Sequence, residues 1–482
     1  MSHDKNLLAG SILLLGLTAT STFAGQPTAP PLKLEPKSDQ HGLVFADGLL
    51  TLDLTERLRF EARSNNNDFN NSVNDDTDDS WLINRFRFGI ALKPAPWLKL
   101  YAQTQDAREW NSERPNVPGV RGDEGDDSFD LRQAYVEFGN LKEFPLSLTV
   151  GRQILNYGDA RLVADPQWTN FGRTFDAVKL RYEQKGIGFV DLFASRVVQI
   201  KEEVFNDSDS EDNFLGAYAS LDLLSFQTTD LYVLYRDKKD NQPDLSPTNA
   251  IDPRGTWNGP AQRITTIGTR WASKKGALGQ WDYGFEGAYQ FGDVWLTDRN
   301  SKKMDQSAYA LHFHGGYTWE EQSWKPRLGL EYNFSSGDKN PADGKSESFF
   351  TLFPSNFAPY GYMDEFAWRN MHNARVQFTV QPTKELSAEL SYHAFWLADT
   401  SDFWYRNGIT ALRSKTPTGA DVRTIGASNF AGHEIDFAVT YKPTYWLTVY
   451  TGYSHFFAGD YLKDTGPSDD ADFGWIYANI QF

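Results

Sequence analysis

The chain has 482 residues, a formal net charge of −17 and no cysteine. The charge argues against nucleic acid as a partner, and the lack of cysteine excludes a disulfide framework and thiol chemistry. No stretch approaches the length of apolar sequence that a membrane-spanning helix needs, and the mean hydropathy is −0.55, which excludes helical spans. The 34 Phe, 22 Tyr and 15 Trp suit the two aromatic girdles of a membrane β-barrel.

The first 24 residues have the features of a secretory signal peptide. Lys5 precedes an apolar run over residues 7–17, and Thr22 and Ala24 form a small-x-small cleavage site before Gly25. This run is too short to cross a bilayer as a helix. The next segment is rich in Pro and Lys and has no periodicity. We therefore expect a signal peptide over 1–24, a periplasmic leader over 25–48 and a single barrel domain over 49–482.

Alternation of apolar and polar residues is the dominant pattern of this domain and predicts β-strands. In the first strand Leu58 and Phe60 share one face, while Arg57 and Arg59 share the other. The fold class that follows is all-β, a single-chain antiparallel transmembrane barrel of about 18 strands, an even number as in bacterial outer-membrane barrels. We expect these strands near residues 50–63, 81–93, 98–110, 128–138, 146–155, 174–183, 187–199, 213–222, 227–236, 262–273, 280–292, 305–319, 325–336, 369–381, 385–398, 430–442, 446–459 and 470–482.

The connections alternate between short turns and long polar loops. Residues 94–97 and 382–384 are typical of the turns, whereas 156–173 and 337–368 are typical of the loops. Membrane barrels have short periplasmic turns and long extracellular loops. A soluble β-sandwich or jelly roll would not show this regular rhythm.

The last strand is apolar on one face and ends on an aromatic residue. Ile476, Ala478, Ile480 and Phe482 share that face. Such a strand closes a barrel against its first strand, and the ending is similar to the signal that the barrel-assembly machinery recognises. We therefore expect the protein in the Gram-negative outer membrane, in contact with lipid and lipopolysaccharide.

The predicted inner face is rich in charge. With about 18 strands the barrel has room for a water-filled channel. Its inward cations are Arg57, Arg59, Arg63, Arg85, Arg87, Lys93, Lys179, Arg181, Arg327 and Arg375, and its inward carboxylates are Asp53, Glu61, Glu183, Glu331, Glu434 and Asp436. One interpretation is an anion path along guanidinium groups; the other is that these charges pair across the wall and stiffen it. The cluster as a whole favours the anion path.

Many of the acidic residues lie in the predicted loops. Residues 75–79, 123–127 and 207–212 each hold several carboxylates. Such loops either stay solvated or bind divalent cations near lipopolysaccharide. The net negative charge of the chain therefore does not contradict an anion path.

Six motifs of the predicted barrel are distinctive: residues 131–137 (LRQAYVE), 150–153 (VGRQ), 330–338 (LEYNFSSGD), 392–396 (YHAFW), 432–436 (GHEID) and 452–457 (GYSHFF). Together they resemble the alginate export family of outer-membrane porins. The resemblance implies an 18-stranded barrel whose arginine-rich constriction passes an acidic polysaccharide, with periplasmic export partners. Arg132 and Arg152 match positions that resemble the family's selectivity site.

Strict alternation conflicts with that role for these two arginines. It places Arg132 with Val136, and Arg152 with Val150, on the apparent lipid side. An isolated arginine at the bilayer midplane costs about 2–4 kcal/mol. A β-bulge beside either residue would turn it inward, and we expect both to point inward.

Loop 337–368 carries oxygen ligands at a spacing that suits Ca²⁺. Asp338, Asn340 and Asp343 are the candidates, although the EF-hand pattern and its closing Glu are absent. The alternative is an ordinary Asx-rich turn. The loop also holds many aromatic residues, among them Phe349, Phe350, Phe353, Phe357, Tyr360 and Tyr362, so we expect it to fold into the barrel mouth or to plug it.

Histidines suggest two further kinds of site, a metal site and a catalytic site, and both are less favoured. His312 and His314 share a face and are suited to chelation, but no third ligand is identifiable, so structural polar positions are favoured. His372, His433 and His455 lie near outer strand ends, where a rim hydrolase would place its catalytic set. No nucleophile elbow, P-loop or dinucleotide motif supports an enzyme. The sequence thus predicts a passive channel without a cofactor, and it leaves export of a polysaccharide and uptake of oligosaccharides or small anions as alternatives.

Overall fold

The structure is a computed structural model that describes residues 42–72, 78–112, 126–201, 204–239, 260–295, 300–355, 357–406 and 411–482. The predicted signal peptide and most of the predicted leader lie outside these residues, as do residues 75–77 and 123–125 of two acidic loop segments. Of the leader, Leu43–Phe45 forms the short strand β1, which pairs with the next strand of the chain. Ala46–Gly48 forms the 3-10 turn η1 between them.

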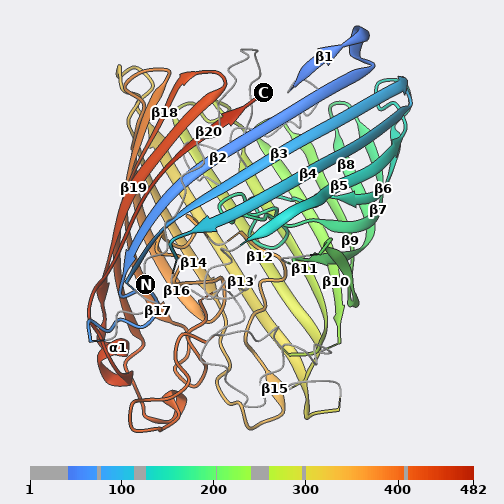
Figure 1. Cartoon of the computed structure of the whole chain (residues 1–482). Helices are drawn as coiled ribbons and strands as arrows, with labels where there is room; N and C mark the ends of the chain where they lie inside the picture. Colours follow the sequence, from blue (N-terminus) through green and yellow to red (C-terminus); the bar gives the residue numbers. More distant parts are fainter. Residues whose placement is uncertain are drawn as a thin grey trace, which may run out of the picture.

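Eighteen long strands close into an antiparallel barrel (Figure 1). Their bounds are β2 (Leu50–Ser64), β3 (Asp79–Ala95), β4 (Leu98–Trp110), β5 (Asp127–Phe138), β6 (Leu146–Gln153), β7 (Phe175–Gln184), β8 (Gly188–Gln199), β9 (Asp207–Leu224), β10 (Gln227–Lys238), β11 (Gln262–Ser273), β12 (Trp281–Trp295), β13 (Lys303–Thr318), β14 (Arg327–Ser335), β16 (Met371–Val380), β17 (Leu386–Leu397), β18 (Phe430–Thr444), β19 (Leu447–Ala458) and β20 (Ala471–Gln481). The number of strands and their order confirm the predicted fold class.

The last strand closes the barrel against the first, as predicted. Thr55 of β2 lies opposite Gln481 of β20, and the pairing runs without interruption to Ser64 and Asp472. Because every strand then has two neighbours, the barrel has no open edge among these eighteen strands. A further two-residue strand, β15 (Lys345–Ser346), lies parallel to β13 within a loop.

Connections differ in length between the two ends of the barrel. Short turns, such as 185–187 and 445–446, lie at the end where the chain terminates. The longest described loops, 336–370 and 398–429, lie at the opposite end with β15 and the short helix α1 (Asp460–Thr465) (Figure 1). This confirms the predicted asymmetry. In the described part of the chain, no helix is long and apolar enough to cross a membrane.

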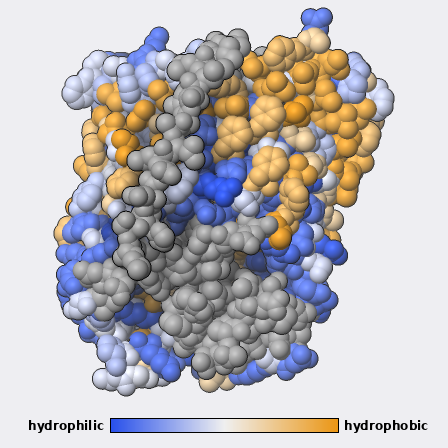
Figure 2. Space-filling view, in the orientation of Figure 1, coloured by the Kyte–Doolittle hydropathy of each residue, from blue (hydrophilic) through white to orange (hydrophobic). Residues whose placement is uncertain are grey.

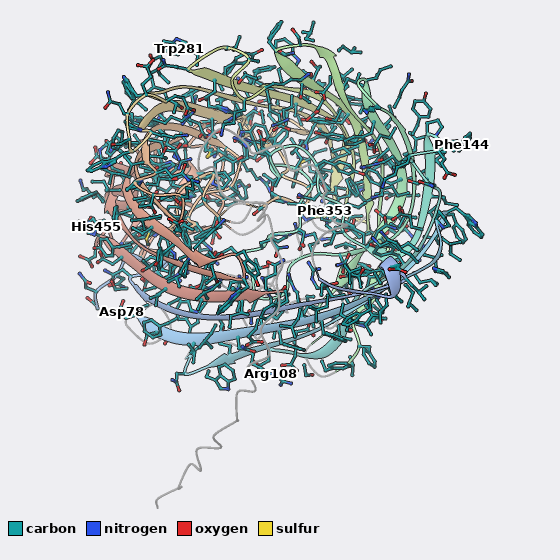
Figure 3. All side chains as sticks on the ribbon, turned by 90° about the horizontal axis from the view of Figure 1, so that it is seen from above. Asp78, Arg108, Phe144, Trp281, Phe353 and His455 are labelled. Atoms are coloured by element: carbon teal, nitrogen blue, oxygen red, sulfur yellow. The ribbon has the colours of Figure 1, made fainter. Side chains whose placement is uncertain are left out.

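The outer face of the wall is apolar and the inner face is polar. In β2, Leu58 is 46% exposed on the outside, whereas its neighbours Arg57 and Arg59 are buried inside. The alternation is a consequence of the two-residue period of a strand. Figure 2 shows apolar residues gathered on the upper part of the wall, and Phe144 and Trp281 project outward near the short turns (Figure 3). This belt suits a bilayer.

One predicted loop is part of a strand. Residues 207–212 belong to β9, where Asp212 lies opposite Lys238 and Asp207 lies opposite Gln199. Asp and Ser have low strand propensity, which is why the sequence indicates a loop. The pairing succeeds because Arg236 of β10 binds the Asp212 carboxylate at 2.5 Å.

Two loops fold into the barrel. The β6–β7 loop (residues 154–174) and the β14–β16 loop (residues 336–370) meet where Val163 bridges to Phe353 and where Trp168 stacks on Phe357 at 3.7 Å between ring centroids. Phe353 lies near the centre of the ring of strands (Figure 3). The buried aromatic residues of both loops form one cluster with lumenal side chains of the wall. The prediction that residues 337–368 enter the barrel is confirmed.

Candidate functional site: an arginine cluster beneath an inner loop

Four arginines of β2 and β3 project into the barrel next to one another. Arg57 and Arg85 lie directly opposite in the strand register, and Arg59 and Arg87 are each two residues further along their own strands. All four are at most 5% exposed. Like charges in direct cross-strand contact are unfavourable by themselves, so other groups must stabilise this arrangement.

The backbone of the β6–β7 loop supplies those groups. Arg57 Nη1 donates to the carbonyl oxygen of Gln167 at 2.7 Å, and Arg85 Nη1 donates to the same oxygen and to that of Thr169, both at 3.1 Å. Arg87 Nη2 donates to the carbonyl of Phe171 at 3.1 Å, and Arg59 donates to that of Trp168. Carbonyl oxygens satisfy hydrogen bonds but carry no net charge, so the positive charge of these guanidinium groups persists.

Glu61 and Arg63 extend the cluster along β2. Arg59 Nε lies 2.5 Å from Glu61 Oε1, and Arg63 Nε lies 3.7 Å from the other oxygen of that carboxylate. Arg63 also donates to the carbonyl of Met363 in the β14–β16 loop at 2.9 Å and lies over the ring of Phe473. Both inner loops are therefore anchored to this part of the wall.

Arg132 points inward because of a β-bulge. Gln103 of β4 pairs with Gln133 of β5, but the next residue of β4, Thr104, pairs with Leu131, so that Arg132 has no partner in the register. The extra residue turns its side chain into the lumen, where Arg132 Nη1 donates to Gln103 Oε1 at 2.9 Å and the guanidinium pairs with Asp165 of the β6–β7 loop. The predicted bulge is thus present at Arg132.

The inward orientation predicted for Arg152 is wrong. Its register with Ala134 and Asp176 is continuous, so no bulge re-aims it, and it shares the outer face with the exposed Val150. Arg152 lies next to the end of β6, where Asp176 binds its Nε at 2.9 Å and the carbonyl of Asn206 accepts from Nη1 at 2.9 Å. These partners at the end of the strand avoid the cost of an unpaired charge in the middle of the bilayer.

Three other predicted lumenal arginines are paired with carboxylates. Arg181 binds Asp191 at 2.7 Å and Arg327 binds Asp282 at 2.6 Å. Arg375 Nη2 lies 2.6 Å from Glu389, and its Nη1 lies 3.5 Å from Glu331. For these residues the geometry supports the alternative in which charges pair within the wall. That Arg57, Arg85 and Arg87 bind backbone carbonyl oxygens of the β6–β7 loop was not apparent from the sequence.

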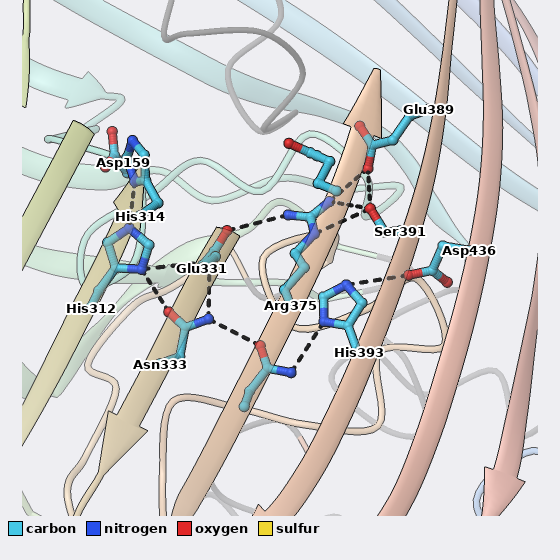
Figure 4. Close-up of polar contacts among 12 residues, drawn as sticks. Asp159, His312, His314, Glu331, Asn333, Arg375, Glu389, Ser391, His393 and Asp436 are labelled. Carbon is cyan, nitrogen blue, oxygen red and sulfur yellow. Dashed lines mark hydrogen bonds and ion pairs between the residues drawn. The ribbon is translucent and has the colours of Figure 1, made fainter. Parts of the chain in front are cut away.

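His312 and Asp436 belong to the polar network of Figure 4. The His312 ring is hydrogen-bonded to Arg161 of the β6–β7 loop at 2.8 Å and to Asn333 at 2.7 Å, which makes it a structural contact between loop and wall. Asp436 accepts from Ser454 at 2.5 Å. Its neighbour Glu434 accepts from the backbone N–H of Met363 at 2.8 Å, so this carboxylate holds the β14–β16 loop.

The candidate calcium ligands form turns. Asp338 accepts from the backbone N–H of Asn340, Asn340 from that of Ala342, and Asp343 from that of Lys345. These are Asx-turns, the alternative interpretation. Within the described residues no group of three or more His, Cys, Asp or Glu side chains could hold a metal ion. The calcium prediction gains no support from this geometry.

The β14–β16 loop is expected to be more stable at mildly acidic pH. Burial, with the carboxylate of Asp402 nearby, raises the pKa of Asp338 to about 6. Because the folded loop holds this proton more tightly than the unfolded chain, the stabilisation is complete below the ordinary pKa and is lost as the pH rises through about 6. Limited proteolysis between about pH 5 and pH 8 measures this change, and Asp338→Asn should flatten it. Equal protection of the wild-type loop at both pH values would contradict the expectation.

The β6–β7 loop is the functional element that the sequence analysis missed. Its length and polar residues indicate an extracellular loop. One available signal is the apolar triplet Leu155, Leu162 and Val163, all buried. The other is Gly172 at φ +74°, where a Cβ atom would come within 3.0 Å of the guanidinium groups of Arg87 and Arg132.

Comparisons with known proteins agree with this architecture. The family model described as alginate export matches residues 49–475. Solved barrels of Pseudomonas aeruginosa are similar in fold: OccK5 (OpdH) has a TM-score of 0.55 at 12% identity over 92% of this chain and 99% of that chain. OpdL has a TM-score of 0.55 at 12% identity over 90% and 98%, and OpdK solved with vanillate has 0.53 at 11% identity over the same shares.

The comparison with curated proteins gave no match. The solved barrels establish the fold alone, because their identity to this chain is low. The family model, in contrast, covers most of the chain, including β2–β5 with their arginines and both inner loops. The chain therefore belongs to the alginate export family and has the fold of outer-membrane porins.

Proposed function

We propose that the protein is an outer-membrane channel through which an anionic saccharide, such as an alginate-like polyuronate, diffuses passively. The observation that carries this proposal is the arginine cluster of β2, β3 and β5, whose guanidinium groups are held mainly by neutral carbonyl oxygens. Glu61 pairs with Arg59, and Asp165 pairs with Arg132. The carbonyl oxygens do not neutralise the guanidinium groups that they bind, and positive charge of this kind attracts anions into a low-dielectric lumen.

The pairing of the other wall arginines supports the same proposal. Arg181, Arg327 and Arg375 are each neutralised by a carboxylate. These three positions therefore add little net charge to the lumen. A planar guanidinium group also suits a uronate, because it binds a carboxylate through two parallel hydrogen bonds.

The β6–β7 loop covers the cluster in this conformation. A solute in the lumen would experience the field of the arginines, whereas direct contact with them requires displacement of residues 167–171. We assign the loop the role of a constriction that sets how closely an anion approaches. The channel needs no cofactor, and we assign it no reaction.

We propose that the channel lies in the outer membrane. An N-terminal signal peptide would export the chain, the barrel-assembly machinery would insert it, and lipid and lipopolysaccharide would surround it. Periplasmic export partners would deliver a polymer in the export direction. Passive diffusion follows whichever gradient exists, so the arginine field serves either direction.

A second candidate function is uptake of small anions. The two inner loops narrow the lumen, which favours a small solute over a polymer. OpdK, a barrel of similar fold, was solved with vanillate, a small carboxylate.

The zero-current potential of the refolded protein in a planar bilayer tests both candidates. Under a salt gradient we expect anion selectivity, and we expect an added oligouronate to block the current while a neutral oligosaccharide of equal length does not. Block by a small aromatic carboxylate but not by the oligouronate would favour the second candidate. Cation selectivity without block would contradict the anionic substrate.

A further inference from the structure

The wall of the barrel is incomplete between β5 and β6. The register of these two strands ends at Ala134 and Arg152. Residues 127–133 continue β5 beyond this point, and no strand of the described part of the chain pairs with them on that side. Their pairing with β4 on the other side is interrupted twice. Because few backbone hydrogen bonds hold this part of β5, the wall is easier to open here than along a regular ladder.

Residues 204–206 of the β8–β9 loop bridge this gap, and we call them the strap. The backbone N–H of Asn206 donates to Asp130 Oδ2 at 2.9 Å, and its side-chain amide donates to Asp127 Oδ2 at 3.1 Å. On the β6 side, Arg152 Nη1 donates to the carbonyl oxygen of Asn206 at 2.9 Å. Side-chain contacts thus close the wall where a strand ladder is lacking, and the strap can leave without separating two paired strands.

Apolar side chains lie on both sides of the gap. Phe129 on the outer face of β5 and Val204 and Phe205 of the strap are each between 60% and 67% exposed. In the lumen, next to the end of the β6–β7 hairpin, Leu155 and Phe175 belong to the buried apolar cluster of the inner loops. An acyl chain therefore finds apolar contacts before and after it crosses the wall.

The rim of the gap is polar, and its groups specify the head of a solute. Asp127 and Asp130 accept hydrogen bonds from the strap, whereas Arg152 donates one. A solute that displaces the strap must both donate to the carboxylates and accept from the guanidinium, because buried polar groups without partners are costly. Neighbouring hydroxyl groups of a sugar do both.

We propose that the strap is a lateral gate through which an acylated saccharide passes between the lumen and the outer leaflet. The sugar takes over the hydrogen bonds of Asn206 at the rim, and the acyl chain stays in contact with the apolar side chains on either side. The gap lies at the loop end of β6, opposite the short turns, and so faces the outer leaflet. This route crosses the wall and is separate from the passage proposed for a polyuronate, so its test does not depend on that passage.

A disulfide across the gap tests this gate, because the chain has no cysteine of its own. The double variant Asp130→Cys/Asn206→Cys joins two residues in hydrogen-bond contact and should hold the strap in place. The full-length protein is placed in vesicles that contain a glycolipid with a diazirine on its acyl chain, and labelled residues are identified by mass spectrometry after illumination. We expect labels on Leu155 and Phe175 in the wild type, several-fold fewer in the oxidised variant, and recovery after reduction.

Two controls make the result specific. Ala177→Cys/Ser195→Cys places a disulfide between β7 and β8, where the register is continuous, and should leave the labelling unchanged. A phosphatidylcholine with the same diazirine chain should label the outer residue Phe129 but not Leu155, because its head donates no hydrogen bond. An unlabelled lumen in the wild type, equal labelling of the oxidised and reduced variant, equal loss in the control disulfide, or equal lumenal labelling by the phosphatidylcholine would each overturn the proposal.

Discussion

Removal of the β6–β7 loop is expected to raise the single-channel conductance several-fold and to strengthen the preference for anions. The loop occupies the lumen and its carbonyl oxygens cover Arg57, Arg59, Arg85 and Arg87. Replacement of residues 159–171 by two glycines would widen the channel and leave these guanidinium groups in contact with the permeating solution. Single-channel recordings in symmetric salt measure the conductance, and reversal potentials measure the selectivity.

Two variants make this result interpretable. Deletion of residues 416–420, an exposed turn of the β17–β18 loop, is the matched control and should leave the conductance unchanged. Asp165→Asn removes the ion pair between the loop and Arg132 while keeping the loop intact, and it should give more frequent transitions to larger conductance levels. If the loop-deletion variant has the conductance of the wild type, the current passes elsewhere and the β6–β7 loop is not the constriction.

Replacement of Arg375 by methionine is expected to lower the free energy of unfolding by about 3–5 kcal/mol. Arg375 and Glu389 are almost fully buried, and their ion pair at 2.6 Å also binds Ser391. Methionine retains most of the side-chain volume but leaves the buried carboxylate of Glu389 without its partner. Urea titration of the refolded barrel, followed by gel mobility of the folded form, measures the loss.

The double variant Arg375→Met/Glu389→Gln should recover part of that stability, because it removes the unpaired charge. Arg263→Met is the control, since Arg263 is about half exposed and lies 4.0 Å from Asp237, and we expect a loss below about 1 kcal/mol. A similar loss for Arg263 and Arg375 would show that burial of the pair is not the cause.

Arg132 and Arg152 show when strand alternation alone predicts the side of the wall on which a residue lies. Alternation placed both on the outer face, and both were nevertheless expected to point inward. Arg132 does so because one extra residue in β5 interrupts the register, whereas β6 continues without interruption through Arg152. A bulge depends on the register between two neighbouring strands, and the sequence around each arginine does not show that register.

The sequence predicted the inward arginines of the candidate site but not the loops that contact them. Arg57 and Gln167 are 110 residues apart, and Arg63 and Met363 are 300 apart. The local sequence pattern cannot show which loop turns into the lumen, or that backbone oxygens of this loop bind Arg57, Arg59, Arg85 and Arg87. Arg375 has its partner, Glu389, on the adjacent strand, yet the sequence analysis favoured an anion path for the cluster that includes Arg375.

The sequence by itself determined the strands, their antiparallel order, the closure of β20 on β2 and the side of the wall on which most residues lie. The physical reason is that a strand has a period of two and one face must be apolar, so each assignment needs only neighbouring residues. Only the tertiary structure decided the fold of the inner loops, the bulge at Arg132 and the partners of the lumenal charges. These depend on contacts between segments distant in the chain, whose energies arise only once the barrel has brought the segments together.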